Sequence, residues 1–255
     1  LPILDVYKSS TTKLIERKFA MTFTIIGRCQ RTGLLGVGIA TYSLAVGSYC
    51  PRVKYGVAAL SNQAFVNPPL GSLAMDLLEN HMSPEDVLED LKEHDPLLTY
   101  RQIGIVGNFG AAACWSGENC RPYVGHEIGD GFVAMGNALA GHHVVEAIAA
   151  TFRGHADCDL DERLLKAIEA GRDAGGQATA DGEHMAERSA ALYVSQPNMA
   201  EIIDLRVDVH NTAVEELRRA FDAYRPYVPH YVWRSLDPKT LPPQDVWAAQ
   251  QGMSI

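Results

Sequence analysis

The segment Met21-Thr22-Phe23-Thr24-Ile25 holds the residue with the most specific chemical potential in this sequence. Thr22 directly follows a methionine at the start of the first strand-like run, so it is a residue that can become a chain terminus. A threonine hydroxyl is a poor nucleophile unless a base lies near it. A free α-amino group on the same residue supplies that base, with a pKa of roughly 7.7–8.0. From one threonine alone, an ordinary β-branched strand residue is the simpler interpretation.

Other motifs favour structural roles. The glycines of residues 36–40 (GVGIA) lie inside a strand pattern after a hairpin turn, whereas a dinucleotide fingerprint needs a following helix. Glycine within a strand more often marks close approach of two backbones. His142-His143 are adjacent and face different directions on a helix, and residues 155–159 lack the spacing of a zinc motif. Cys29 lies in a turn and is interpreted as an inert thiol. We therefore expect no cofactor and no bound metal.

The composition is that of an acidic globular protein. The 255 residues are 47% hydrophobic and 21% charged, close to the globular average. The net charge of −9 argues against a nucleic-acid partner, which needs clustered Lys and Arg. No run of about 18 apolar residues occurs, so we expect neither a transmembrane helix nor a membrane partner. Five scattered cysteines without a CxxC pair favour reduced thiols and a cytoplasmic location.

Strand-like runs come in pairs. Residues 22–28 and 34–41 flank a short loop ending in Gly33, and residues 102–106 and 111–115 flank a glycine-bounded turn, so each pair predicts a β-hairpin. Several runs are small and apolar on both faces, which indicates sheets buried on both sides. The predicted strands cover residues 22–28, 34–41, 55–61, 102–106, 111–115, 131–136, 189–195 and 202–208.

Helical patterns also come in pairs. Ser83 as N-cap, Pro84 at the first helical position and two acidic residues after it predict one helix start. Paired helices between antiparallel strands do not form the right-handed crossovers of a Rossmann sheet. They fit an α+β fold in which helices cover two stacked sheets, a four-layer α/β/β/α sandwich. The other predicted helices cover residues 71–81, 143–153, 160–171 and 212–224.

The chain divides into three segments. Residues 1–20 have no continuous apolar run and precede the first methionine, so we interpret them as a leader or extension. Residues 21–225 hold the predicted domain. Residues 226–255 carry five of the 13 prolines and predict a tail that packs on the domain or forms an interface arm. Because of this tail we expect a homo-oligomer.

A series of motifs runs through the predicted domain in one order. It begins with MTFTIIGR, TGLLGVGIAT, LAVGSYCP and GVAALSNQAFVNPPLG. It continues with RQIGIVGNFGAAACWSGENC, PYVGHEIGDGFVAMGNALAG, SAALYV and DLRVDVH. In these motifs and their order, the sequence resembles a bacterial family of unknown function, number 1028. The members of that family look like N-terminal-nucleophile (Ntn) hydrolases. The resemblance covers residues 21–225 and extends to the fold, which it implies is Ntn-hydrolase-like.

The resemblance implies an amidohydrolase that cleaves a C–N bond of a small or peptide-like amide. Thr22 would be the nucleophile and its own α-amine the general base, with an ester intermediate that water hydrolyses. An oxyanion needs hydrogen-bond donors, and polar residues of the matching segments are the candidates. They are Ser43, Asn62 and Gln63 as catalytic residues, with Asn67, His126 and Asn137 as substrate-binding residues.

Two departures from the family pattern leave alternatives open. While residues precede it, Thr22 has an amide nitrogen and no free amine, so the mechanism requires their removal. At residues 186–189 the chain reads Ala-Glu-Arg-Ser, where family members usually carry Gln before Ser. A non-catalytic binding or assembly protein on the same fold is one alternative, because fold does not determine function. A metal-dependent hydrolase that uses the His-rich segments is another.

Overall fold

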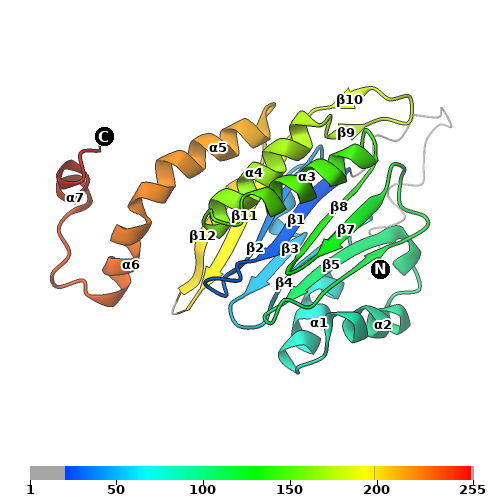
Figure 1. The fold of residues 1–255 in the computed structure, drawn as a ribbon, viewed down its shortest axis with the longest axis horizontal. Coiled ribbons are helices and arrows are strands. Elements are labelled where there is room, and N and C mark those ends of the chain that lie inside the picture. Colours follow the sequence, from blue (N-terminus) through cyan, green and yellow to red (C-terminus); the bar gives the residue numbers. More distant parts are fainter. Residues whose placement is uncertain (1–20, 198, 254–255) are drawn as a thin grey trace, which may run out of the picture.

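The computed structural model describes residues 21–197 and 199–253, which form an α+β protein (Figure 1). Within these residues there are two main antiparallel sheets and a two-stranded ribbon. The strands of the six-stranded sheet are, in spatial order, β12 (Met199–Val207), β11 (Ser189–Gln196), β2 (Leu35–Thr41), β1 (Thr22–Arg28), β8 (Phe132–Asn137) and β7 (Gly125–Gly129). Those of the four-stranded sheet are β3 (Pro51–Lys54), β4 (Ala58–Ala64), β5 (Arg101–Gly107) and β6 (Ala112–Ser116). The ribbon pairs β9 (Gln177–Ala178) with β10 (His184–Met185).

Helices pack on the outer face of each sheet (Figure 1). The four-stranded sheet contacts α1 (Pro68–Glu79) and α2 (Pro84–His94), and the six-stranded sheet contacts α3 (His142–Gly154), α4 (Leu160–Asp173) and α5 (Ala213–Tyr224). The chain ends with α6 (Val228–Leu236) and α7 (Gln244–Gln250). Short 3-10 turns lie at Val46–Ser48, Leu98–Tyr100 and Arg225–Tyr227. No helix of the described residues is long and apolar enough to cross a membrane.

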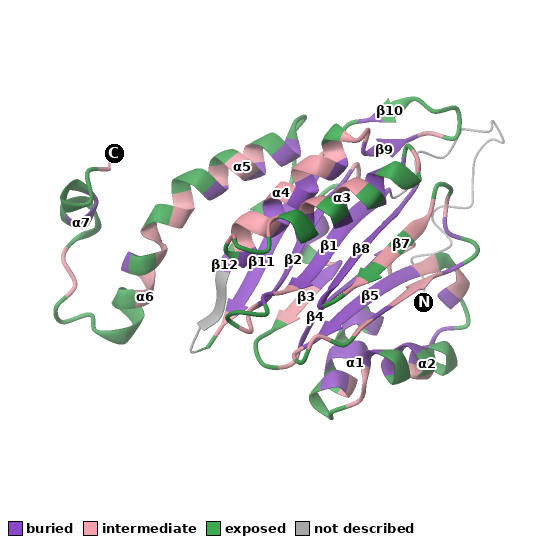
Figure 2. Ribbon diagram, in the orientation of Figure 1, coloured by how far each residue is buried: buried purple, intermediate pink, exposed green. Residues whose placement is uncertain are grey.

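Apolar side chains form three layers, and the central strands are buried on both faces (Figure 2). Successive residues of a strand point to opposite faces. Phe23 and Ile25 of β1 therefore pack under α3 and α4, whereas Ile26 lies between the two sheets. On the four-stranded sheet, Leu60 and Ile103 pack under α1 and α2. This burial fixes the register of each strand, because a one-residue shift would exchange its two faces.

The two predicted hairpins are confirmed as the antiparallel pairs β1–β2 and β5–β6. The strands predicted over residues 189–195 and 202–208 form a further antiparallel pair, β11–β12. The prediction of a strand over residues 55–61 was wrong at both ends. A turn with Gly56 at φ 74° occupies its start, and β4 continues through polar residues to Ala64. The first helix starts at Pro68 rather than at residue 71. Strands β3, β7, β9 and β10 and helices α6 and α7 were not predicted. The predicted leader, residues 1–20, lies outside the described residues.

Candidate functional site

A row of polar side chains crosses the six-stranded sheet at the first residue of β1. Thr22 pairs with Thr41 of β2 on one side and with Asn137 of β8 on the other. Thr41 in turn pairs with Ser189 of β11. Paired residues of neighbouring antiparallel strands point to the same face. The four side chains therefore lie side by side on the face toward the four-stranded sheet, and all four are buried.

The hydroxyl of Thr41 connects Thr22 to the residue before it. The Thr22 hydroxyl donates to Thr41 Oγ1 at 3.2 Å, and the Thr41 hydroxyl donates to the backbone carbonyl of Met21. The backbone N–H of Ser43 also donates to Thr41 Oγ1, at 3.2 Å. Thr41 therefore orients the Thr22 hydroxyl and at the same time polarises the carbonyl of the Met21–Thr22 peptide bond.

A second set of hydrogen bonds joins the two sheets beneath this row. Thr24, one inward-facing position along β1, donates to Gln63 Oε1 at 2.6 Å. Gln63 Nε2 donates to Gln102 Oε1 at 2.9 Å, and Asn137 Nδ2 donates to the same oxygen at 3.1 Å. Gln63 and Gln102 are fully buried. Buried amides are stable only when their polar atoms are paired, so this network holds Asn137 in place beside Thr22.

The network continues outward to His126. Gln102 Nε2 donates to Ser116 Oγ at 2.9 Å, and Ser116 Oγ lies 2.9 Å from Nδ1 of His126. A hydroxyl donates one hydrogen bond and accepts up to two, so Ser116 either donates to His126 Nδ1 or accepts from it, depending on the tautomer of the ring. Partial burial lowers the pKa of His126, which favours the neutral form of the ring.

The Oδ1 atom of Asn137 is buried without a hydrogen-bond partner among the described residues. An unpaired buried acceptor of this kind costs about 1–3 kcal/mol and calls for an explanation. Asn137 and Thr22 are register partners on adjacent strands, so the side chain that carries this unpaired oxygen lies beside Thr22.

Two of the predicted site residues lie on a different face. Asn62 of β4 pairs with Ile103, whose side chain packs under α1 and α2. Its Nδ2 donates to the backbone carbonyl of Asn67 at 2.6 Å, and Asn67 Nδ2 lies 3.4 Å from a carboxylate oxygen of Asp95. The structure therefore brings together Thr22, Ser43, Gln63, Asn137 and, through Ser116, His126, but it places Asn62 and Asn67 across the four-stranded sheet.

The segment between α4 and β11 borders the same end of the six-stranded sheet. Gln177 Oε1 accepts from the backbone N–H of Tyr42, and Gln177 Nε2 donates to Glu187 Oε1 at 3.3 Å. Glu187 is 5% exposed, and this burial raises the pKa of its carboxyl.

Sequence reasoning missed Thr41, Gln102 and Ser116. Thr41 and Ser116 end β2 and β6, and Gln102 is the second residue of β5. A polar residue at a strand end is ordinarily exposed, so their sequence positions carry only a weak signal. The cavities found in the described part of the chain include one at the opposite end of β1, lined by Cys29 and Arg31, which the polar row does not reach.

Among the described residues, no group of three or more His, Cys, Asp or Glu side chains comes close enough to bind a metal ion. The fold and the site together define an α+β domain whose first core strand begins in a buried polar cluster between two antiparallel sheets.

The chain belongs to the Family of unknown function (DUF1028), whose profile matches residues 22–217, beginning at Thr22 itself. The chain is also similar to the crystal structure of the protein SPO2555 from Silicibacter pomeroyi, which carries the same family designation. The two are 26% identical, with a TM-score of 0.72 over 80% of this chain and 89% of that one. No curated protein shows a significant match.

Proposed function

We propose that this chain is an Ntn-type amidohydrolase in which Thr22 attacks a C–N bond of a small or peptide-like amide. The observation that carries the proposal is the Thr22 hydroxyl in a buried polar row, held by Thr41 and flanked by the unpaired oxygen of Asn137. Apart from this row and the hydrogen-bond network of Thr24, Gln63 and Gln102 beneath it, the layer between the sheets is largely apolar. Buried polar groups in such a layer are costly unless they have a use. The three apolar layers support the proposal that the fold is the four-layer α/β/β/α sandwich of Ntn hydrolases.

Three residues of the row, Thr22, Thr41 and Asn137, have a role once Thr22 has a free amine. The amine, acting through a water molecule, takes the hydroxyl proton while Thr22 Oγ1 bonds to the substrate carbonyl carbon. The C–N bond breaks, the proton passes to the leaving amine, and water then hydrolyses the ester. Asn137 Oδ1 accepts a hydrogen bond from the Thr22 amine and orients it. The Thr41 hydroxyl, released from the Met21 carbonyl, donates to the oxyanion.

The same row offers a route to the free amine. Thr22 Oγ1 attacks the Met21 carbonyl carbon, whose oxygen already accepts a hydrogen bond from Thr41. The peptide C–N bond breaks as the C–O bond forms, and the hydroxyl proton moves to the Thr22 nitrogen. Water then cleaves the ester, leaving a carboxylate on Met21 and an amine on Thr22. In this proposal Thr41 is therefore an oxyanion donor both in this step and in the reaction with substrate.

The test compares a chain that begins at Thr22 with the full chain, which retains the preceding residues, and with the variants T22A and T22S of the shortened chain. A panel of acyl p-nitroanilides serves as substrates, and T212A, which removes an exposed threonine at the start of α5, is the matched control. We expect the shortened chain, its T22S variant and its T212A variant to turn over substrate at least about 1,000-fold faster than T22A. Turnover that T22A retains would refute the proposal.

Intact mass after incubation of the purified full chain tests the self-cleavage step separately. We expect loss of residues 1–21 in the wild type, slower loss in T41V and none in T22A. If T41V cleaves as fast as the wild type, the role of Thr41 is wrong. A non-catalytic assembly role remains the second candidate function, favoured by the exposed apolar surface of the C-terminal helices.

A further inference from the structure

Residues 225–253, here called the arm, extend away from the body of the protein beyond the end of α5 (Figure 1). The arm consists of a 3-10 turn (Arg225–Tyr227), α6 and α7. It lies outside the family match, which ends at residue 217. The arm is therefore an addition to the domain that carries the polar row.

Aromatic side chains connect the two helices of the arm. Trp247 of α7 lies 5.3 Å from the ring of His230 and 6.0 Å from that of Tyr227, measured between ring centroids. His230 Nε2 lies 3.2 Å from the carbonyl oxygen of Pro242, in the connection between the helices. One aromatic layer between two short helices is a small core, and units of fewer than about 40 residues usually need further stabilisation.

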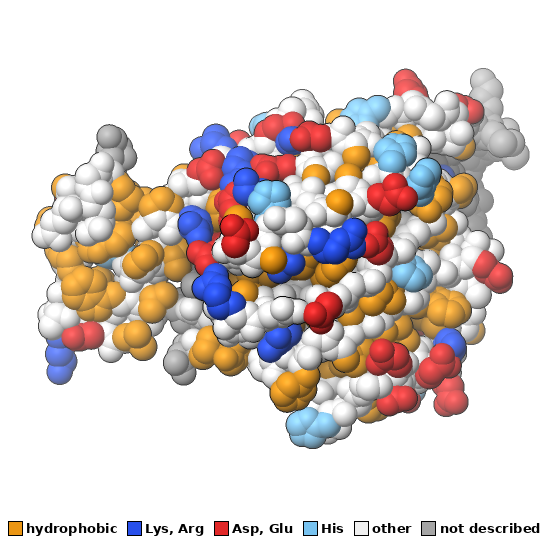
Figure 3. Space-filling view, in the orientation of Figure 1, with side chains coloured by type: hydrophobic (Ala, Val, Ile, Leu, Met, Phe, Trp, Pro, Cys, Tyr) orange, Lys and Arg blue, Asp and Glu red, His pale blue; other side chains and the backbone are white. Residues whose placement is uncertain are grey.

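The outward surface of the arm is apolar (Figure 3). Trp233 is 37% exposed, Leu236 70% and Val246 43%. Pro229, Trp233 and Leu236 are spaced at i, i+4 and i+7 on α6, which places them on one face of the helix. A contiguous exposed apolar surface is typical of an interaction site.

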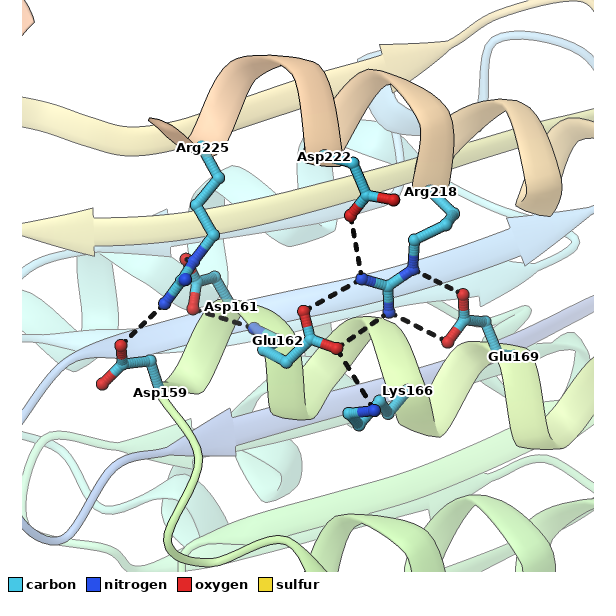
Figure 4. A network of polar contacts seen from close by, with 8 residues as sticks. All are labelled: Asp159, Asp161, Glu162, Lys166, Glu169, Arg218, Asp222 and Arg225. Carbon is cyan, nitrogen blue, oxygen red and sulfur yellow. Dashed lines mark hydrogen bonds and ion pairs between the residues drawn. The ribbon is translucent and has the colours of Figure 1, made fainter. Parts of the chain in front are cut away.

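Ion pairs hold the base of the arm against the body (Figure 4). Arg218 of α5 bonds Glu162 at 2.9 Å and Glu169 at 2.7 Å, both on α4. Arg225 bonds Asp159 at 2.7 Å and, on α4, Asp161 at 2.9 Å. The hydrogen bonds from each guanidinium fix its orientation, so the direction in which the arm leaves the body is set by α4.

An apolar cavity of about 380 Å³ lies at the base of the arm. Its apolar wall comes from the β1–β2 hairpin, α4, the β11–β12 hairpin and the first residues of α6: Leu34, Leu160, Val194, Ile203, Val228 and Pro229. Its charged rim is neutralised internally, because Asp159 bonds both Arg31 and Arg225. The rim therefore does not specify a charged ligand, and the wall suits an apolar side chain.

The charge distribution favours a second copy of this chain as the occupant. Residues 226–255 contain one Arg, one Lys and two Asp, so their net charge is zero, and the whole −9 belongs to the rest of the chain. Two copies repel each other through their bodies and not through their arms. The apolar face and the apolar cavity are on the same chain, which allows two copies to exchange contacts reciprocally around a two-fold axis.

We propose that the arm is a homodimerisation element, in which α6 of one copy packs on the partner's arm and inserts an apolar side chain into the cavity at the partner's base. The family domain then carries the candidate active site, and the arm holds two copies of the chain together.

Sedimentation velocity of the full chain across a concentration series tests the proposal. We expect a dimer of twice 27.8 kDa for the wild type. W233A should weaken association at least about 30-fold, as loss of an aromatic anchor does, and L236E should abolish it because it places an unpaired carboxylate in the interface. F109S is the matched control, since Phe109 is 94% exposed in the β5–β6 turn. Circular dichroism checks that each variant is folded.

A wild-type chain that is monomeric throughout, or dimers that persist in L236E, would overturn the proposal. So would binding of the monomer to anionic phospholipid vesicles through the arm, because that would make a membrane its partner. Crosslinking tests the cavity directly, since Cys29 lines it. With diamide added as the oxidant, we expect L236C to form an intermolecular disulfide that is lost in L236C/C29S. A crosslink that survives C29S would mean that the two arms contact each other and leave the cavity empty.

Discussion

Replacing Gln102 with leucine removes the residue on which the polar network converges. Gln102 is fully buried, and its Oε1 accepts from both Gln63 and Asn137. Its Nε2 donates to Ser116 and to the backbone carbonyl oxygens of Gly125 and Gly136, at 2.9–3.1 Å. Leucine has a similar volume and no polar atoms. The variant therefore leaves the amide groups of Gln63 and Asn137 without their acceptor while changing the packing little.

The expected cost follows from those two orphaned donors. A buried donor without an acceptor costs about 1–3 kcal/mol, so two cost about 2–6 kcal/mol. Burial of the leucine side chain offsets about 1–2 kcal/mol of this. We therefore expect the free energy of unfolding of Q102L to fall by about 1–4 kcal/mol. For a chain of this size, that corresponds to a fall in Tm of roughly 2–16 °C.

Urea unfolding followed by tryptophan fluorescence and circular dichroism measures the change. Q30L is the matched control, because Gln30 is an exposed glutamine that bonds Asp130 on the surface; its effect should stay within about 0.5 kcal/mol. A Q102L variant as stable as Q30L would mean that the amides between the sheets find other partners. The account of Asn137 as a residue held beside Thr22 would then be wrong.

Three further predictions concern thiol reactivity, pH dependence and packing. Burial raises the pKa of Cys29, but hydrogen bonds from the neighbouring Thr32 hydroxyl and from backbone N–H groups outweigh it and lower the pKa, which argues against the inert thiol that the sequence indicated. Burial raises the pKa of Cys114 far above its usual range. Iodoacetamide at neutral pH, followed by peptide mass mapping, should modify Cys29 before Cys114, and equal rates would contradict this. Burial raises the pKa of Glu187, so the unfolded chain loses this proton at a lower pH than the folded chain does. The free energy of unfolding therefore falls as the pH rises from the unfolded-state pKa through the folded-state pKa. E187Q should therefore be more stable than the wild type at pH 8 and equal to it at about pH 3, in paired urea titrations. In G36A the new Cβ would lie 2.5 Å from a backbone carbonyl oxygen of β11, so we expect a loss of about 1–3 kcal/mol, compared with no loss in G154A, where nothing lies within 4 Å.

Local turn chemistry explains why the hairpins were predicted and other elements were not. Gly33 and Gly110 have φ angles of 73° and 93°, a conformation that glycine adopts readily, so the turns are visible in the sequence. Strand β7 is an edge strand with exposed positions, and its sequence GHEIG has little apolar periodicity. Helices α6 and α7 were missed because the prolines suggested a tail or interface arm without helices. Pro229 lies in the first turn of α6 and Pro243 caps α7, positions where a missing N–H costs nothing.

The contrast between Asn62 and Gln63 shows the limit of prediction for the site. Both lie in the motif that the resemblance identifies, but successive strand residues point to opposite faces. Gln63 joins the network beneath Thr22, whereas Asn62 bonds the start of α1. A predicted strand that ended at residue 61 left both residues in a loop, where this alternation does not apply. Gln102 requires knowledge of which strands lie opposite each other, which a single sequence does not contain.

Burial of Thr22 links the two requirements of the proposed mechanism. Thr22 is 3% exposed and Met21 is 3% exposed, and Met21 packs with Ala138, Met185 and Tyr42 at the end of the six-stranded sheet. A substrate carbonyl therefore cannot approach Thr22 while Met21 remains. Cleavage of the Met21–Thr22 bond frees the amine that serves as base, removes the side chain that covers the nucleophile, and releases the Thr41 hydroxyl from the Met21 carbonyl. Cleavage of this single bond therefore makes the general base, the access of substrate and the oxyanion donor available together. A chain that keeps Met21 should be inactive even when its hydrogen-bond network is intact.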